Sequence, residues 1–158
     1  MADPPGGVKK GRLYWLYSLE VRYLGLDVGD ARIGVALSDE TATLASGLPT
    51  LVRVGPRKDV KAVAALVREH GAGEVVVGMP RRLDGSLGPQ AEKVGAFMAD
   101  VRAAVRVPVV EWDERFTSVI ATQALIEGGM RRRDRKAAVD KVSAVLILQS
   151  YLDARPRT

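Results

Sequence analysis

The chain has 158 residues, of which 47% are hydrophobic and 27% are charged, and this balance is typical of a globular protein rather than a disordered one. No apolar run approaches the roughly 20 residues needed to span a bilayer, and the absence of cysteine excludes disulfides and thiolate metal sites. The formal net charge of +5 is compatible with a polyanionic partner such as nucleic acid. These features predict a cytoplasmic protein that has no membrane partner.

The first 20 residues differ in composition from the rest of the chain. They are rich in proline, glycine and basic residues, and their apolar run LYWLYSL is too short for the core of a secretory signal. We therefore expect a flexible N-terminal extension over residues 1–20, one domain over residues 21–154 and a short tail over residues 155–158.

Three apolar runs open the predicted domain. The runs Arg22 to Val28 and Ile33 to Ser38 are joined by GDAR, which is typical of a hairpin connection. A third strand is predicted near Leu48 to Val54 and contains Pro49. Because proline cannot donate a hydrogen bond to a neighbouring strand, this third strand is predicted to lie at a sheet edge.

Helical and strand patterns alternate after the third strand. The predicted elements are a helix over 59–70, a strand over 74–79, a helix from Pro89, a strand over 107–112, and helices over about 117–127 and 137–152. This order predicts an α/β protein with a mixed five-stranded sheet. Three strands would form an antiparallel meander, two would be parallel, and helices would cover both faces.

Four acidic residues lie at the ends of predicted elements. Asp27 ends the first strand, Asp113 and Glu114 end the last strand, and Asp140 falls in the first turn of the last helix. If the first and last strands were neighbours, the strand carboxylates would converge at one edge, and the helix could bring Asp140 over them. Close carboxylates raise one another's pKa, and a divalent cation relieves that conflict. Ligands that are all oxygens favour Mg²⁺ or Mn²⁺, which can activate water for phosphodiester hydrolysis.

Each acid also has a simpler explanation. Asp27 could be a turn residue, and the acidic pair that ends the last strand could cap the following helix or form an ion pair with Arg115. Asp140 in a first helical turn would complement the helix dipole. The joint arrangement of the acids, rather than any one of them, favours a metal site.

Two basic segments are candidates for phosphate contacts, although either could be a solvated loop. Arg81 and Arg82 lie in a loop after a central strand, where α/β sheets commonly bind ligands. The second segment is expected to be a loop just before Asp140, and its cations are Arg131, Arg132, Arg133, Arg135 and Lys136. Phosphate contacts there would provide affinity without sequence information, and that affinity would depend steeply on salt.

Four motifs, in this order, resemble the YqgF/RuvX family, whose members are pre-16S rRNA nucleases related to Holliday-junction resolvases. The motifs are LGLDVGDARIGVALSD, VVVGMPRRLDGS, WDERFTSVIA and KAAVDKVSAVLILQSYL, and the resemblance covers roughly Tyr23 to Asp153. It implies an RNase H-like fold and a nuclease that depends on Mg²⁺ or Mn²⁺.

The resemblance also implies roles for individual residues. Asp27, the Asp113 and Glu114 pair, and Asp140 would be the catalytic metal ligands, with Glu114 favoured over Asp113. Further positions implied by the resemblance are Gly29 and Gly34 in the turn beside the metals, and Arg115 and Thr117 beside the scissile phosphate.

Several functions stay open from the sequence. The resemblance favours structured RNA as the partner, in processing of the 5′ end of precursor 16S rRNA, with branched DNA as the alternative. The first motif also looks like a phosphate loop of the actin and sugar-kinase fold, but those proteins clamp nucleotide between two such domains. A third possibility is a nucleic-acid-binding protein without catalytic activity. No stretch of the chain distinguishes a monomer from a homodimer.

Overall fold

The computed structural model describes residues 21–114 and 132–155, and for residues 132–141 it describes the backbone alone. The predicted N-terminal extension and the helix predicted over 117–127 lie outside these residues. The described elements are β1 (Arg22–Val28), β2 (Arg32–Ser38), β3 (Ala45–Val52), α2 (Pro56–His70), β4 (Ala72–Met79), α3 (Pro89–Ala104), β5 (Val109–Asp113) and α5 (Arg132–Ala154). None of these helices has the length and apolar character that a membrane span requires.

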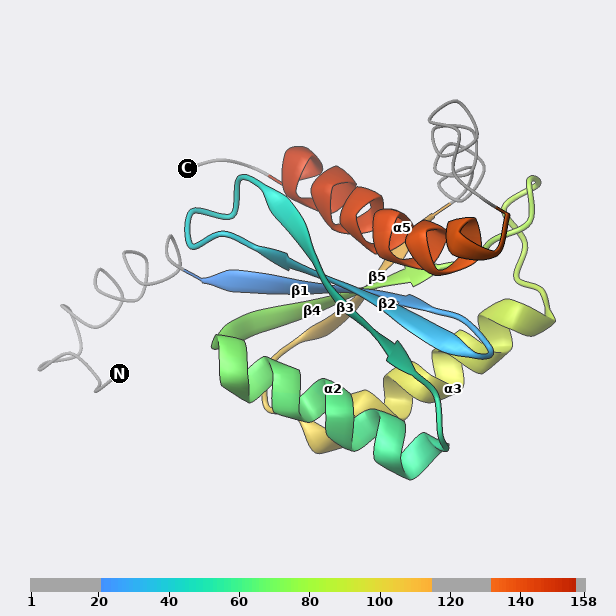
Figure 1. Cartoon of the computed structure of the whole chain (residues 1–158), viewed down its shortest axis with the longest axis horizontal. Helices are drawn as coiled ribbons and strands as arrows, with labels where there is room; N and C mark the ends of the chain where they lie inside the picture. The colour runs from blue at the N-terminus through green and yellow to red at the C-terminus, as the bar shows by residue number, and fades with distance from the viewer. Residues whose placement is uncertain (1–20, 115–131, 156–158) are drawn as a thin grey trace, which may run out of the picture.

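The strands form one mixed sheet in the order β3-β2-β1-β4-β5 (Figure 1). The β1–β2 and β2–β3 pairs are antiparallel, whereas the β1–β4 and β4–β5 pairs are parallel. The predicted meander with two added parallel strands is therefore confirmed, and β3 lies at an edge as Pro49 indicated. The condition considered for convergence of the strand carboxylates, that the first and last strands are neighbours, is not met, because β4 lies between β1 and β5.

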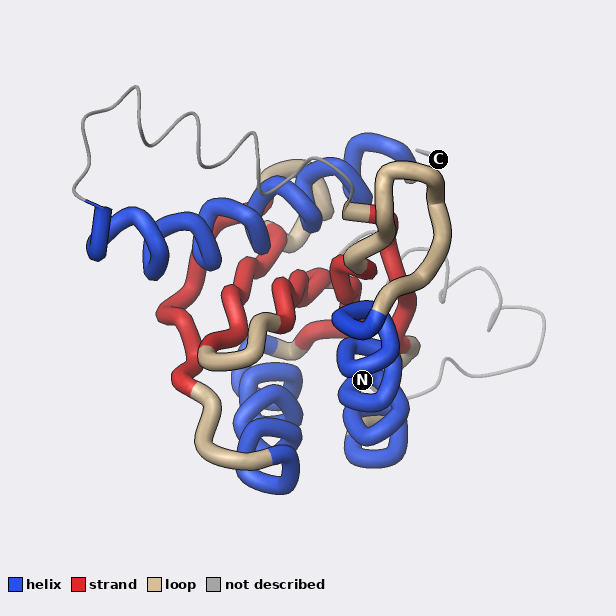
Figure 2. Tube along the Cα trace, turned by 90° about the vertical axis from the view of Figure 1, so that its right-hand side faces the viewer, coloured by secondary structure: helices blue, strands red, loops and turns tan. Residues whose placement is uncertain are grey.

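Helices cover both faces of this sheet (Figures 1 and 2). The helices α2 and α3 pack side by side over a buried core that includes Leu24 and Leu26 of β1. The helix α5 crosses the opposite face, where Tyr23 packs with Ile147 and Leu148. Successive strand residues point to opposite faces, so the odd-numbered residues of β1 are those that face α5.

The helix α5 begins earlier than predicted, at Arg132 rather than at residue 137. The basic segment was expected to be a loop, but from Arg132 onward it forms the first turns of the helix. Arginine and lysine have high helix propensity, which is compatible with this extension. Asp140 consequently lies well inside the helix and not in its first turn, so complementing the helix dipole does not explain it.

A glycine and a glutamine fix α5 on the sheet. A Cβ atom on Gly25 of β1 would lie 2.7 Å from the Cβ of Leu148, so only glycine permits this close approach. Gln149 joins α5 to the start of β3 and the segment before it, because its Oε1 accepts a hydrogen bond from the Ala45 N–H at 2.9 Å and its Nε2 donates to the Thr43 carbonyl at 2.9 Å. These contacts set the position of the helix along the strands.

The turn between β1 and β2 is linked to α2 through Asp59, which is only 4% exposed. The carboxylate of Asp59 accepts hydrogen bonds from the Val54 N–H at 2.9 Å and from Nε of Arg53 at 3.0 Å. Nη1 of Arg53 donates to the Gly29 carbonyl at 2.9 Å. Burial raises the pKa of Asp59, but these hydrogen bonds outweigh burial and hold the pKa below its ordinary value.

We expect Asp59→Ala to lower the free energy of unfolding by roughly 3 kcal/mol at pH 7, because it leaves Arg53 without its buried partner. The pKa of Asp59 is lower in the folded than in the unfolded state. The contribution of Asp59 to the free energy of unfolding is therefore present above its unfolded pKa of 3.8, and it is lost as the pH falls through its folded pKa. Urea unfolding at pH 7 and pH 3 measures the difference from wild type, which should shrink at pH 3. An equal difference at both pH values would contradict this account.

Candidate active site

Asp27 lies on the α5 face of the sheet between glycines of both neighbouring strands. Gly34 of β2 is its antiparallel partner, and the parallel register Leu26↔Val77 places Gly78 of β4 beside it on the other side. Neither glycine has a side chain, so both flanks of the Asp27 carboxylate are free of side-chain bulk from these partners. Gly34 was expected in the turn, but it lies within β2, opposite Asp27.

Glu114 follows β5 directly and extends over the same face. Its N–H donates to the Met79 carbonyl at 3.3 Å, which continues the pairing of β4 with β5. Trp112 contacts α5 through a hydrogen bond from Nε1 to Oγ of Ser150 at 3.0 Å. Because side chains alternate along a strand, Glu114 faces α5 as Trp112 does, and Asp113 points to the opposite side.

The carboxyl groups of Asp27 and Glu114 meet above Gly78. A Cβ atom on Gly78 would lie 2.5 Å from Oε2 of Glu114, so the absent side chain provides the space for this carboxyl group. Burial, the charge of Asp27, a side-chain hydrogen bond with Asp27 and the charge of Asp113 raise the pKa of Glu114 to about 8. Two strands that are not neighbours therefore contribute to one acidic pair.

The chemistry of this pair fits a divalent cation. Oε2 of Glu114 is buried without a hydrogen-bond partner, and a cation would both occupy that oxygen and relieve the repulsion from Asp27. Among the side chains that the structure describes, no three His, Cys, Asp or Glu residues are grouped to hold a metal. The side chain of Asp140, the third predicted ligand, lies outside the described part.

The raised pKa of Glu114 predicts how the metal-free protein responds to pH. Between the unfolded value of 4.5 and the folded value of about 8, the folded state binds the extra proton, so the free energy of unfolding falls as the pH rises through this window. Glu114→Gln stays neutral and is expected to flatten this decline, which makes it more stable than wild type at pH 8 by several degrees in Tm.

Thermal unfolding in EDTA at pH 5, 6.5 and 8 measures this effect. Glu92→Gln removes an exposed glutamate of α3 and is a matched control that should keep the wild-type decline. The assignment would be contradicted by a Glu114→Gln variant whose Tm falls with pH in parallel with wild type.

The path of α5 brings the backbone of Asp140 toward the same end of the sheet. Late helix residues lie over the start of β1, since the rings of Tyr23 and Tyr151 are 6.0 Å apart. Residues earlier in α5 lie further along β1, because the Ala144 carbonyl would be 3.3 Å from a Cβ atom built on Gly25. Asp140 is one turn before Ala144 on the same helical face, so the helix continues in the direction of Asp27.

The chain matches the RuvX family, described as Holliday junction resolvase, over residues 21–154. It belongs to this family. A relative from Caldanaerobacter subterraneus subsp. tengcongensis, named "Putative pre-16S rRNA nuclease", is 49% identical over 136 residues, covering 85% of this chain and 98% of the relative. A relative of the same name from Moorella thermoacetica is 49% identical over 133 residues, covering 84% of this chain and 95% of the relative. The resemblance inferred from the four motifs is confirmed.

Solved structures share the fold of this RuvX-family chain. T. thermophilus RuvC in complex with a Holliday junction substrate has a TM-score of 0.55 at 15% identity, covering 85% of this chain and 97% of that one. The large terminase nuclease from thermophilic phage G20c has a TM-score of 0.52 at 12% identity, covering 83% and 81%. The predicted RNase H-like fold is therefore confirmed.

The cations predicted to contact phosphate lie in two places in the described structure, the loop after β4 and the first turns of α5. Arg81 ties its loop to β5, because its guanidinium donates to the Gly85 carbonyl of the loop and to the Glu111 carboxylate of the strand, each at 3.2 Å. Arg82 is exposed on the same loop. Four further cations of this RuvX-family chain lie on the first turns of α5 by their backbone, namely Arg132, Arg133, Arg135 and Lys136. The predicted residues outside the described part are Arg115, Thr117 and Arg131.

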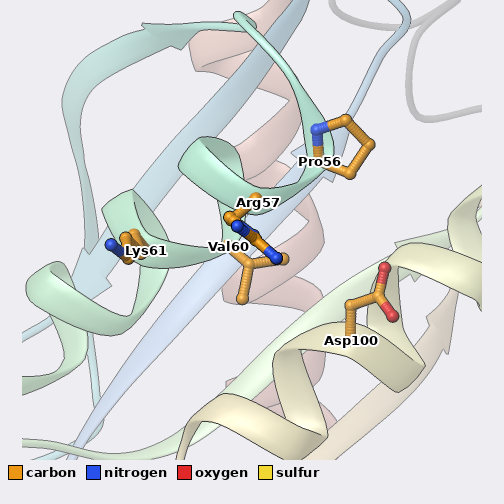
Figure 3. A pocket seen from close by; sticks show the side chains of 5 residues that line it. All are labelled: Pro56, Arg57, Val60, Lys61 and Asp100. Atoms are coloured by element: carbon orange, nitrogen blue, oxygen red, sulfur yellow. The ribbon is translucent and has the colours of Figure 1, made fainter.

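A surface pocket of about 400 Å³ lies between α2 and α3 (Figure 3). Its lining combines aliphatic surface with charged groups of both helices, namely Pro56, Arg57, Val60, Lys61 and Asp100. These helices cover the sheet face opposite α5, so this pocket is separate from the acidic pair of the RuvX-family chain.

Proposed function

We propose that this RuvX-family protein is a divalent-metal-dependent nuclease that hydrolyses phosphodiester bonds at the 5′ end of precursor 16S rRNA. The observation that carries the proposal is the meeting of Asp27 and Glu114 above Gly78, with one Glu114 oxygen buried and unpaired. The names of relatives that are nearly half identical to this chain support the choice of RNA.

In this proposal, Asp27, Glu114 and Asp140 hold Mg²⁺ or Mn²⁺. When bound, the ions supply an activated water molecule and stabilise the leaving oxygen. Asp27 is fixed because β1 is paired on both sides, with β2 and with β4. Glu114 is fixed by its N–H bond to Met79, and the strand alternation that directs Asp113 to the other face supports Glu114 as the ligand of the pair.

Cations at the same end of the sheet are proposed to hold the RNA backbone. The exposed Arg82 and the basic first turns of α5 would contact phosphates, and Arg115 and Thr117 would lie beside the scissile phosphate. Arg81 would act indirectly by bracing its loop, since two of its five N–H donors bind Gly85 and Glu111. Contacts of this kind position a nucleic acid without reading its sequence.

The proposed function is tested with a precursor 16S rRNA fragment and a four-way DNA junction, each incubated with the protein in Mn²⁺ or in EDTA. We expect the RNA to be cleaved in Mn²⁺, no cleavage in EDTA, and little cleavage of the junction. Preferential cleavage of the junction would establish the second candidate function, which the resolvase description of the RuvX family favours. Binding of both substrates without cleavage of either would contradict both and indicate a binding protein.

A further inference from the structure

Ser143 of α5 has a buried hydroxyl group whose structural role is not explained by packing. The residue is 0% exposed, and its Oγ has no hydrogen-bond partner. A serine inside a helix commonly donates to the carbonyl one turn earlier, and buried polar groups are nearly always paired. In the described part of the chain, Oγ of Ser143 and Oε2 of Glu114 are the two buried side-chain atoms that lack a partner.

The free Glu114 oxygen and the end of the Ile147 side chain lie next to the same point of the sheet, at Gly78. A Cβ atom on Gly78 would be 2.5 Å from Oε2 of Glu114 and also 2.5 Å from Cδ1 of Ile147. Ser143 is one turn before Ile147 on the same helical face, and helical side chains lean toward the helix N-terminus. The end of the Ile147 side chain therefore lies below the turn that carries Ser143, beside the free oxygen of Glu114.

Ser143 is also adjacent to the third proposed ligand along the helix. Residues three apart on a helix share one side, so the backbone places Ser143 beside the position of Asp140. Since neither Ser143 nor the free Glu114 oxygen has a partner, the two groups do not hydrogen-bond to each other. A hydrated cation beside Glu114 would supply a partner to both oxygens.

We infer that Ser143 is a positioning residue of the acidic site, whose hydroxyl binds a hydration water of the divalent cation that Asp27 and Glu114 hold. The inference rests on the proposed function. Mg²⁺ and related ions keep several waters when they bind to proteins, so an O–H group of one such water would pair the Ser143 oxygen while the cation pairs the Glu114 oxygen. Outer partners of this kind orient metal ligands and affect metal affinity.

The test compares full-length wild type with Ser143→Ala by isothermal titration with MnCl₂ and by thermal unfolding in EDTA. We expect Ser143→Ala to weaken Mn²⁺ binding about tenfold, while its metal-free Tm equals or exceeds that of wild type because an unpaired buried hydroxyl has been removed. Ser150→Ala is the matched control on the same helix, where the hydroxyl pairs with Trp112 instead, and its Mn²⁺ affinity should equal that of wild type.

The possible outcomes separate this inference from the proposed function. Mn²⁺ affinity of Ser143→Ala within twofold of wild type would overturn the role of Ser143 and leave the metal site intact. A lower metal-free Tm for Ser143→Ala would also overturn it, because the hydroxyl would then serve the fold. If wild type itself bound no Mn²⁺, the proposed function and the inference would both fail. Ser143→Thr keeps the hydroxyl, and its affinity should stay within threefold of wild type.

Discussion

Asp27→Asn is expected to reduce cleavage of the precursor RNA on the order of 1,000-fold or more while RNA binding persists. Asparagine keeps the shape of the side chain and removes the charge that would hold the cation. The substitution also removes the repulsion between Asp27 and Glu114, so the metal-free variant should be at least as stable as wild type. A loss of activity without a loss of stability is the expected signature of a ligand at this position.

Asp30→Asn is the matched control for this prediction. It removes the same charge three residues away, from an aspartate that is 69% exposed and lies 3.5 Å from Nζ of Lys93. Single-turnover cleavage in Mn²⁺ should be unchanged within about threefold in this control, and filter binding should give the same RNA affinity for all three proteins. Wild-type cleavage by Asp27→Asn would exclude Asp27 from the chemistry.

Gly78→Ala is expected to damage both stability and activity. The new Cβ would stand 2.5 Å from Oε2 of Glu114 and from Cδ1 of Ile147, so the Glu114 carboxyl must leave its place or α5 must move away from β4. Overpacking of this kind costs about 1–3 kcal/mol in the free energy of unfolding. Because displacement of Glu114 separates the acidic pair, cleavage should fall by at least roughly 100-fold.

Gly95→Ala gives the matched control for this second prediction. Gly95 lies in α3, and a Cβ atom there would have no neighbour within 4 Å. Alanine is expected to stabilise this helix by about 0.5–1 kcal/mol and to leave cleavage unchanged. Urea unfolding and single-turnover cleavage measure both variants. Wild-type cleavage by a folded Gly78→Ala protein would show that the space above Gly78 is not needed for activity.

The elements with strong local signals were predicted well. The bounds of β1 are those predicted, and β2 begins one residue earlier, because an apolar run on each side of a short polar turn defines both strands. The start of α5 was missed by five residues, since a run of cations fits a solvated loop as well as a helix surface. The insertion of β4 between β1 and β5 depends on contacts far apart in the chain, which no local pattern contains.

The candidate site was only partly accessible from the sequence. Asp27 and the acidic residues at the end of β5 stand out in the sequence as charges at strand ends. The choice between Asp113 and Glu114, however, depends on which face of β5 packs against α5. That face is known only from the structure, where Trp112 hydrogen-bonds to Ser150 of α5. The sequence does not indicate the role of Gly78, which the structure places beneath the Glu114 carboxyl. That role comes from the register of two parallel strands.

The position of α5 after all five strands in the chain has a consequence for protein synthesis. A nascent chain that has produced the sheet but not α5 would expose the face on which Tyr23, Ala36 and Val76 lie, and it would lack Asp140. The proposed site is thus completed only by the last described helix to be translated.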